Sequence, residues 1–319
     1  MRTAVHLLLL SIAAVQVAAA AANITAVFAF GDSILDAGNN NGLLTIAQAN
    51  HAPYGINFPG RAATGRFSDG KLTSDIIASE LGIKAAVPAY LDPAVTDGDL
   101  LTGVSFASAG SGLDAAVTPR VGNVVSLEKQ MEYFQTAAAR MRRSAGEAAA
   151  NRSIENGLFL ISAGSNDMMI NKYILPLRLN FSVSQYQDFL IQKMDAFIRE
   201  LYSVGARRVA VLGMPPLGCV PLIITWEKIK HFHLPGSDRT CVDAYNSDSE
   251  AFNLKLRQLL SDLPPSLGSA VKVAYVETYA PAMDMINRPA AYGFEDTVWM
   301  LWIWYSGNRE SVHKEFDIV

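Results

Sequence analysis

Short, mostly apolar runs alternate with longer helix-like segments along most of the chain. Five runs are candidate strands: Ala26–Phe30, Val104–Ala107, Leu158–Ser162, Arg208–Leu212 and Val271–Val276. Four segments have a helix-like pattern: Ser68–Leu81, Ser126–Ala149, Val183–Val204 and Asp243–Leu260. Continuous apolar runs are typical of strands buried on both faces of a parallel sheet. Strands that alternate with helices indicate βαβ units, so we predict an α/β fold with helices on both faces of one sheet.

The composition of the chain indicates a single domain with no nucleic-acid partner. Half of the 319 residues are apolar and 18% are charged, which is enough for a sizeable core. We see no internal repeat, and the proline-containing stretches Pro53–Arg61 and Pro215–Pro235 are predicted to be loops rather than linkers. The net charge is −4 and no basic patch stands out, so we expect no nucleic-acid partner.

The N-terminus resembles a secretory signal peptide. Arg2 supplies a positive charge, Leu7–Val17 is a short apolar stretch, and small residues follow up to Ala22. The alternative is a membrane anchor, but the apolar stretch is short and rich in alanine. We therefore predict a signal peptide over residues 1–22, a secreted protein with one domain over residues 23–319, and no stable membrane span.

A secreted protein can contain disulfide bonds and attached glycans, and the sequence has candidate residues for both. The two cysteines, Cys219 and Cys241, can form a disulfide in an oxidising compartment, and the alternative is two free buried thiols. A loop of this length would contribute on the order of 3 kcal/mol through chain entropy. Three sequons mark candidate glycosylation sites: Asn23, Asn151 and Asn180.

Polar, glycine-rich sequences follow the candidate strands directly. They are Gly31-Asp32-Ser33, Ser108-Ala109-Gly110-Ser111-Gly112, Ala163-Gly164-Ser165-Asn166-Asp167 and Gly213-Met214-Pro215-Pro216-Leu217-Gly218. Ligands of open parallel sheets bind at the carboxyl ends of the strands. The functional residues are therefore expected in these four loops.

The first three loops contain the groups that acyl transfer to water requires. The Ser33 hydroxyl can attack an ester carbonyl. The N–H groups of Ser33 and Gly110 and the side-chain amide of Asn166 can stabilise the oxyanion that forms. Glycine at position 110 would let the backbone approach the substrate. Each feature alone also has a structural explanation, as a turn or a helix cap, but three at successive strand ends favour an esterase.

Longer motifs around these residues resemble those of plant GDSL esterases/lipases of the SGNH hydrolase superfamily. "FAFGDSILDAGNNN" resembles the block with the nucleophile, which assigns that role to Ser33. "GVSFASAGSG" and "ISAGSND" resemble the two oxyanion blocks and assign those roles to Gly110 and Asn166. Further matches are "PYGINFPGRAATGRFSDGKLTSDIIASELG" and "VAVLGMPPLGCVP".

The resemblance covers nearly the whole chain, to about Glu295. It implies a three-layer α/β/α, flavodoxin-like fold with a parallel five-stranded sheet, and hydrolysis of carboxylic esters without a metal or other cofactor. Cys241 lies where the family tends to place the second half of a disulfide. Within the first block, we expect Asp32 to hold the turn and the asparagines to form turns and caps that lead the chain away from the site.

The resemblance is lost after Glu295, where the family supplies Asp-x-x-His followed by proline as the acid and base. Here Glu310 and His313 have the corresponding spacing, with Lys314 in place of proline. The alternative is a chance match. His231 and His233 have the spacing of metal ligands but no acidic or cysteine cluster near them, so we expect no metal site.

Two hypotheses follow. The first is a secreted serine esterase/lipase that acts on a small ester or a lipid, with Ser33 as nucleophile and Glu310 and His313 as acid and base. The second is a catalytically crippled, truncated family member that at most binds acyl ligands. Because the last motif is degenerate, we expect well-formed Ser33 and oxyanion donors with the base absent or misplaced, and therefore a feeble esterase.

Overall fold

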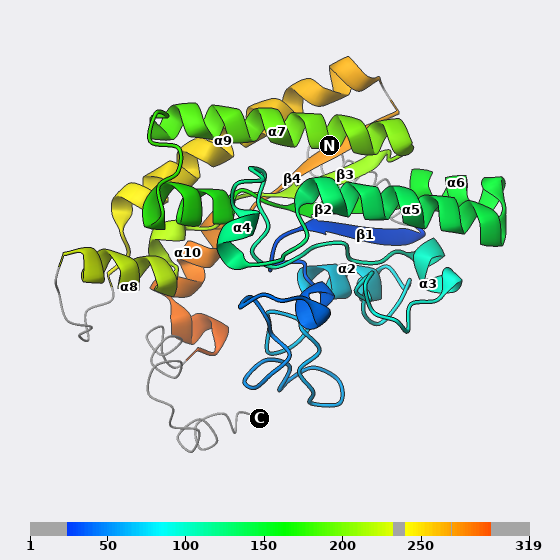
Figure 1. Cartoon of the computed structure of the whole chain (residues 1–319), viewed down its shortest axis with the longest axis horizontal. Coiled ribbons are helices and arrows are strands. Elements are labelled where there is room, and N and C mark those ends of the chain that lie inside the picture. The colour runs from blue at the N-terminus through cyan, green and yellow to red at the C-terminus, as the bar shows by residue number, and fades with distance from the viewer. Residues whose placement is uncertain (1–23, 232–239, 269, 295–319) are drawn as a thin grey trace, which may run out of the picture.

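The computed structural model describes residues 24–231, 240–268 and 270–294 (Figure 1). Four strands form one sheet in the order β1-β2-β3-β4. They are β1 Ala26–Gly31, β2 Gly157–Ser162, β3 Arg208–Leu212 and β4 Lys272–Val276. Every neighbouring pair is parallel. The predicted parallel α/β fold is therefore confirmed, with four strands in place of the expected five.

The expected fifth strand, Val104–Ala107, is an extended segment beside β1 that does not form a regular ladder. It makes one parallel bridge to β1, between Ala29 and Ser105, and another between Ser105 and Ala89. The Ala29 N–H donates to the Val104 carbonyl at 3.2 Å, and the Phe106 N–H donates to the Ala29 carbonyl at 2.7 Å. On the side away from β1, the Asn39 Nδ2 donates to the carbonyls of Ser105 and Ala107 at 2.8 and 2.7 Å.

Helices connect the strands in the predicted alternation. Between β1 and β2 lie α2 Thr73–Glu80, α3 Asp97–Thr102, α4 Thr118–Val121, α5 Leu127–Ala145 and α6 Glu147–Glu155. The later helices are α7 Val183–Val204, α8 Pro221–Lys230, α9 Asp243–Leu267 and α10 Tyr279–Asn287. Short helical turns are η1 Asn39–Gly42, η2 Asp167–Ile174, η3 Leu217–Cys219 and η4 Pro289–Tyr292.

The helix bounds differ from the prediction in several places, and the helix expected over Ser68–Leu81 begins only at Thr73. The single helix expected over Ser126–Ala149 is divided at Gly146 into α5 and α6. The helix that begins at Asp243 continues past Leu260 to Leu267. The loop expected over 215–235 contains α8, because Pro221 occupies the first helical turn, where its missing N–H costs nothing.

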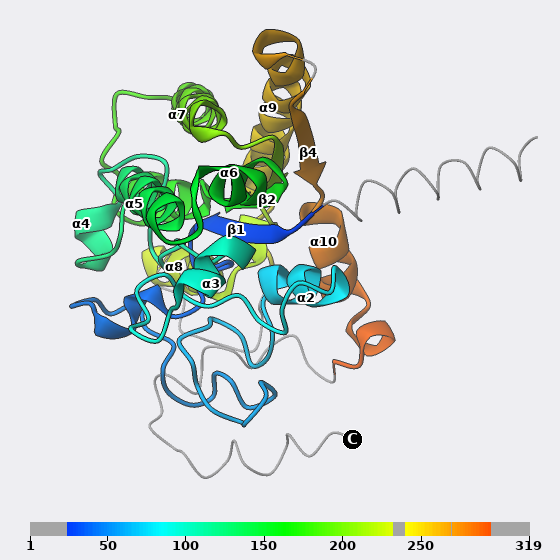
Figure 2. The same ribbon diagram turned by 90° about the vertical axis from the view of Figure 1, so that its right-hand side faces the viewer.

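Alternate residues of β1 face two different cores. Phe28 and Phe30 belong to the larger core, together with buried residues of α5, α7 and α9. Val27 and Ala29 belong to a smaller core with Ala78 of α2. Figure 2 shows α5, α6 and α7 on one side of the sheet, and α2 and α10 on the other. The three-layer α/β/α arrangement follows from this period-two pattern.

Aromatic rings fix α5 against β1. Phe134 of α5 packs edge-on against Phe28 and Phe30, with ring centroids 5.6 and 5.7 Å apart. Phe159 of β2 lies 5.4 Å from Phe134 in the same geometry. These contacts hold the start of α5 beside the carboxyl end of β1, where the first functional loop begins.

The described residues include no helix with the length and apolar character that crossing a membrane requires. The predicted signal peptide, residues 1–22, lies outside the described residues.

Candidate active site

The turn after β1 presents Ser33 and is held by Asp32. The Asp32 N–H donates to the Ser162 carbonyl at 2.9 Å, which joins the ends of β1 and β2. The Asp32 Oδ1 accepts from the Ile34 N–H and from the Ser162 hydroxyl, both at 3.1 Å. This is the local bonding expected of Asp32. Burial raises the pKa of its carboxyl to about 7, although these hydrogen bonds oppose the shift. Ser33 itself is only half-buried.

Gln130 of α5 holds the last residue of β1, a role that the sequence analysis missed. Its Oε1 accepts from the Gly31 N–H at 2.7 Å, and its Nε2 donates to the Gly31 carbonyl at 2.9 Å. The same amide donates to the Val125 carbonyl at 3.0 Å. Gln130 is fully buried in the apolar stripe of α5 formed by Leu127, Met131 and Phe134. A glutamine within the apolar stripe of a predicted helix could have indicated from the sequence that this side chain bonds a buried backbone group.

Gly110, in the second loop, has a positive φ of 85°. A Cβ atom there would lie 2.4 Å from Cγ1 of Val121. The sequence analysis attributed the missing side chain to the approach of a substrate. In the structure, the side chain of Val121 fills that space, so packing and backbone conformation account for this glycine.

The third loop is joined to the second through Asn166 and Asp167. The Asn166 Nδ2 donates to the Ser111 carbonyl at 2.8 Å. The Asp167 carboxyl accepts from the N–H groups of Leu113 and Asp114 at 2.9 and 2.7 Å. Burial raises the pKa of Asp167 to about 7, and the nearby Asp114 carboxylate adds to the shift.

The first and second loops are also connected directly. The Gly31 carbonyl, two residues before Ser33, accepts from the Ser108 N–H at 2.9 Å and from the Ser111 hydroxyl at 2.6 Å. Because Asn166 in turn binds the Ser111 carbonyl, a short chain of hydrogen bonds connects the loops of Ser33, Gly110 and Asn166. All three loops therefore lie together at one end of the sheet.

Several N–H donors in these loops have no partner within the described part of the chain, and three of them belong to Ser33, Gly110 and Asn166. Within the described part of the chain, the N–H groups of Ser33 and Gly110 have no hydrogen-bond partner, and Asn166 uses only one of its two amide hydrogens. Their neighbours Asp32, Ile34, Ala109 and Ser111 all donate to protein oxygens. The N–H groups of Gly112 and Gly164 are also unpaired within the described residues, so this end of the sheet offers several donors to a ligand, including those of Ser33, Gly110 and Asn166.

The polar residues after Ser33 do more than form turns. The Asp36 carboxyl accepts from the N–H groups of Gly38, Asn39 and Ala109, at 2.7–2.8 Å. Asn40 donates to the Ala109 carbonyl at 2.9 Å, and its Oδ1 accepts from the Ser108 hydroxyl. The asparagines form the turn η1, as expected, and they also connect the first block to the second. Burial raises the pKa of Asp36 to about 6.

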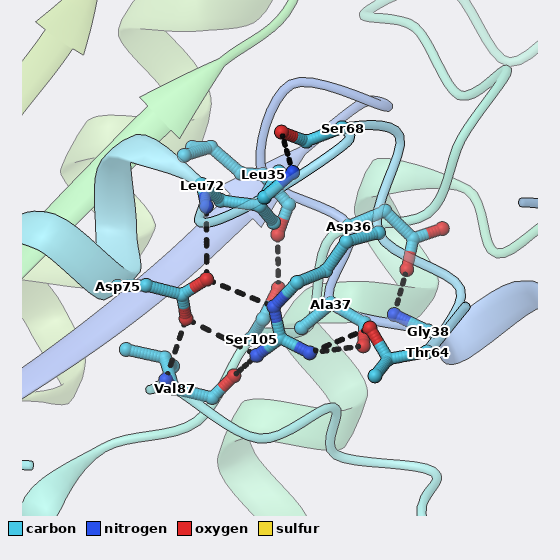
Figure 3. Close-up of polar contacts among 12 residues, drawn as sticks. Leu35, Asp36, Ala37, Gly38, Thr64, Ser68, Leu72, Asp75, Val87 and Ser105 are labelled. Atoms are coloured by element: carbon cyan, nitrogen blue, oxygen red, sulfur yellow. Dashed lines mark hydrogen bonds and ion pairs between the residues drawn. The ribbon is translucent and has the colours of Figure 1, made fainter. Parts of the chain in front are cut away.

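A buried ion pair, Arg66–Asp75, stabilises the segment that follows Ser33. Arg66 and Asp75 form two hydrogen bonds of 2.8 and 3.1 Å, and Arg66 also donates to the carbonyls of Ala37 and Val87. Figure 3 shows the Asp75 carboxylate accepting from the N–H groups of Leu72 and Val87. One guanidinium therefore connects the segment after Ser33 to α2 and to the chain that follows it.

The proposed acid and base, Glu310 and His313, lie outside the described residues, as does His233. The Ser33 hydroxyl makes no hydrogen bond to the residues that are described. His51 is exposed and contacts the Ala52 carbonyl, and His231 lies 3.8 Å from Glu227 on α8. No cluster of three potential metal ligands occurs in residues 24–231, 240–268 and 270–294.

Cys219 and Cys241 form a disulfide bond in the structure, with Cα atoms 4.4 Å apart. It connects the turn after β3 to the residues before α9. Two of the three sequon asparagines are described and exposed: Asn151 lies within α6, and Asn180 lies in the loop before α7. Asn23 lies outside the described residues.

Comparison with known proteins agrees with the family resemblance of the sequence motifs. The family model of GDSL-like lipases/acylhydrolases matches residues 27–308, a range that includes Ser33, Gly110 and Asn166 but not Glu310 and His313. GDSL esterase/lipase At2g40250 of Arabidopsis thaliana is 45% identical over 297 residues, which cover 92% of this chain and 81% of that protein. GDSL esterase/lipase EXL3 of the same plant is 45% identical over 272 residues, covering 85% and 72% of the two chains.

Proposed function

Because the chain belongs to the GDSL-like lipase/acylhydrolase family, a family of ester hydrolases, we propose that it is a secreted serine esterase with Ser33 as nucleophile. The observation that carries this proposal is the set of three uncommitted donors beside Ser33, on Ser33 itself, Gly110 and Asn166. These donors lie in three loops that hydrogen bonds join at one end of the sheet. In an esterase they bind the carbonyl oxygen as it acquires negative charge.

The reaction proceeds in two steps. The Ser33 oxygen attacks the ester carbonyl carbon while its proton passes to the base, and the three donors stabilise the tetrahedral oxyanion. The intermediate collapses to an acyl-serine as the base returns the proton to the departing alcohol. Water then attacks the acyl-serine in the same manner and releases the carboxylic acid. We assign the base to the imidazole of His313, oriented by Glu310.

The first test of this proposal is hydrolysis of p-nitrophenyl butyrate by the wild type and by Ser33→Ala. Loss of the nucleophile should lower kcat by at least about a thousandfold. Asp195→Asn, which changes a partly exposed residue of α7, is the control and should retain full activity. Equal rates for the wild type and Ser33→Ala would refute the proposal.

The role of His313 is tested separately, because the last motif is degenerate and the alternative is a protein that only binds acyl ligands. His313→Ala should lower kcat by about a thousandfold or more if the imidazole is the base. Near-background rates in both proteins would instead support the binding role. A Ser33-dependent rate that survives His313→Ala would assign the base to another residue.

A further inference from the structure

An aliphatic groove lies beside the loop of Gly110. It has a volume of about 530 Å³ and is formed by two segments, Leu43–Gln48 and Arg120–Gly122. The segments are joined by an antiparallel bridge between Thr45 and Gly122 and by a hydrogen bond from the Asn123 N–H to the Leu44 carbonyl at 3.0 Å. The two segments are therefore fixed against each other, and the groove between them is broadly open to solvent.

Leu44 and Ile46 are the most exposed large aliphatic side chains in the described part of the chain. They are 85% and 84% exposed, and both line this groove. Isolated exposed leucines are common, but two such residues on one wall of a groove indicate an apolar ligand or partner.

The polar side chains of the groove are already bonded to the protein. The Thr45 hydroxyl donates to the Val121 carbonyl at 2.7 Å and accepts from the Ala47 N–H at 3.1 Å. The Gln48 amide donates to the carbonyls of Asn40 and Leu43 at 3.2 and 3.0 Å. Arg120 carries the single charge of the lining, and no carboxylate is present. The lining therefore favours a hydrocarbon chain over a sugar or a cation.

The groove adjoins the loop of Gly110. Val121, one of its lining residues, occupies the space where a side chain at position 110 would lie. Asn40 also connects the two, because its amide donates to the carbonyls of both Ala47 and Ala109. Val121 and Asn40 thus join the groove to the loop of Gly110, where we take the ester carbonyl to bind.

We propose that this groove binds the aliphatic acyl chain of the ester substrate and makes the protein selective for medium or long acyl chains over acetyl esters. The inference rests on the proposed function, because it takes Gly110 as the position of the ester carbonyl. Leu44 and Ile46 are then specificity residues. Each methylene buried in the groove contributes about 0.8 kcal/mol, or roughly fourfold in binding.

A binding experiment tests the groove without depending on turnover. cis-Parinaric acid, a fluorescent fatty acid, is titrated into Ser33→Ala protein and into the same protein with Leu44→Ser and Ile46→Ser. The double substitution should weaken binding at least about tenfold. Ile76→Ser with Leu254→Ser is the matched control, because it removes two exposed aliphatic side chains from α2 and α9 and should leave binding unchanged.

A kinetic experiment tests selectivity in the active protein. kcat/KM for p-nitrophenyl acetate, butyrate and octanoate should rise with acyl length in the wild type. Leu44→Ser with Ile46→Ser should reduce kcat/KM progressively more as the acyl chain lengthens. A loss of the same size for all three esters would overturn the inference.

The outcomes separate the groove from the proposed function. Fatty-acid binding that depends on Leu44 and Ile46, in a protein without Ser33-dependent hydrolysis, would support the groove and refute the esterase. Ester hydrolysis with no effect of Leu44 and Ile46 on binding or selectivity would overturn the groove alone. Two other outcomes would also overturn the proposal that the groove binds an acyl chain. The substitutions could abolish only binding to phosphatidylcholine vesicles, which would indicate a membrane contact, or only self-association measured by sedimentation, which would indicate a contact between copies of the chain.

Discussion

Asn166 provides the most specific prediction at the scale of single residues. It donates one amide hydrogen to the Ser111 carbonyl and keeps the second uncommitted. Removal of one oxyanion donor typically lowers kcat by about 10²–10³-fold. Asn166→Ala should therefore lower kcat for p-nitrophenyl butyrate by that factor, with a much smaller change in KM. An unchanged kcat in a folded Asn166→Ala protein would remove Asn166 from the oxyanion site.

Gln130 is predicted to act on stability, since it bonds both backbone groups of Gly31 and the Val125 carbonyl. Gln130→Leu leaves the Gly31 N–H and the Val125 carbonyl unpaired, at about 1–3 kcal/mol each, whereas the Gly31 carbonyl keeps its bonds from Ser108 and Ser111. We expect a loss of about 2–5 kcal/mol in the free energy of unfolding by urea. Gln135→Leu, which replaces an exposed glutamine on the same helix, should change it by less than about 0.5 kcal/mol. Similar losses in the two variants would contradict the role of Gln130.

At the scale of elements, the strands and most helices followed from the sequence. The apolar runs predicted β1, β2 and β3 within a residue at either end, and the predicted bounds of α7 agree with the structure. Local patterns contain this information, because burial on both faces requires continuous apolar residues. The segment Val104–Ala107 differs because a distant side chain, Asn39, takes the place of a neighbouring strand.

The connections between elements could not be predicted in the same way. Gln130 and Gly31 are 99 residues apart, and Arg66 binds the chain at both Ala37 and Val87. One sequence shows which residues are polar, but not which distant backbone groups lack a partner. The motifs of Ser33, Gly110 and Asn166 were found because each follows a strand or strand-like segment. Glu310 and His313 remain predictions.

The Arg66–Asp75 ion pair tests the connection between the first block and α2. Its side chains are 7% and 0% exposed. Arg66→Leu should destabilise the protein by about 3–5 kcal/mol, because it leaves the Asp75 carboxylate buried without its cation. Arg140→Leu is the control, since Arg140 and Asp97 form a pair whose members are both more than 40% exposed. That change should cost at most about 1 kcal/mol. Comparable losses, measured by urea unfolding, would contradict the role assigned to the buried pair.

At the scale of the whole molecule, three buried carboxyls determine how stability depends on pH. Burial raises the pKa of Asp32 and Asp167 to about 7 and that of Asp36 to about 6, from a usual value of 3.8. Between about pH 4 and pH 7, these three carboxyls are therefore protonated in the folded protein but ionised in the unfolded chain. Stability should therefore fall as the pH rises from about 4 to about 7, and level off above that range.

Urea unfolding at pH 5 and pH 8 measures this dependence. The wild type should be more stable at pH 5 by several kcal/mol, since one pKa unit corresponds to about 1.4 kcal/mol. Asp32→Asn stays neutral at both values and should reduce the difference, whereas Asp195→Asn at a partly exposed position should not. Greater stability at pH 8 would show that these carboxyls are ionised in the folded protein.

The central claim is that Ser33 is a nucleophile activated beside the donors of Gly110 and Asn166. A fluorophosphonate tests it most directly, because it phosphonylates an activated serine and places an oxygen in the oxyanion site. Mass spectrometry of the intact and digested protein should find one adduct per chain, on Ser33. Labelling should be lost in Ser33→Ala and slowed at least about a hundredfold in Asn166→Ala. Absence of an adduct from the wild type, or an adduct on another residue, would contradict the account.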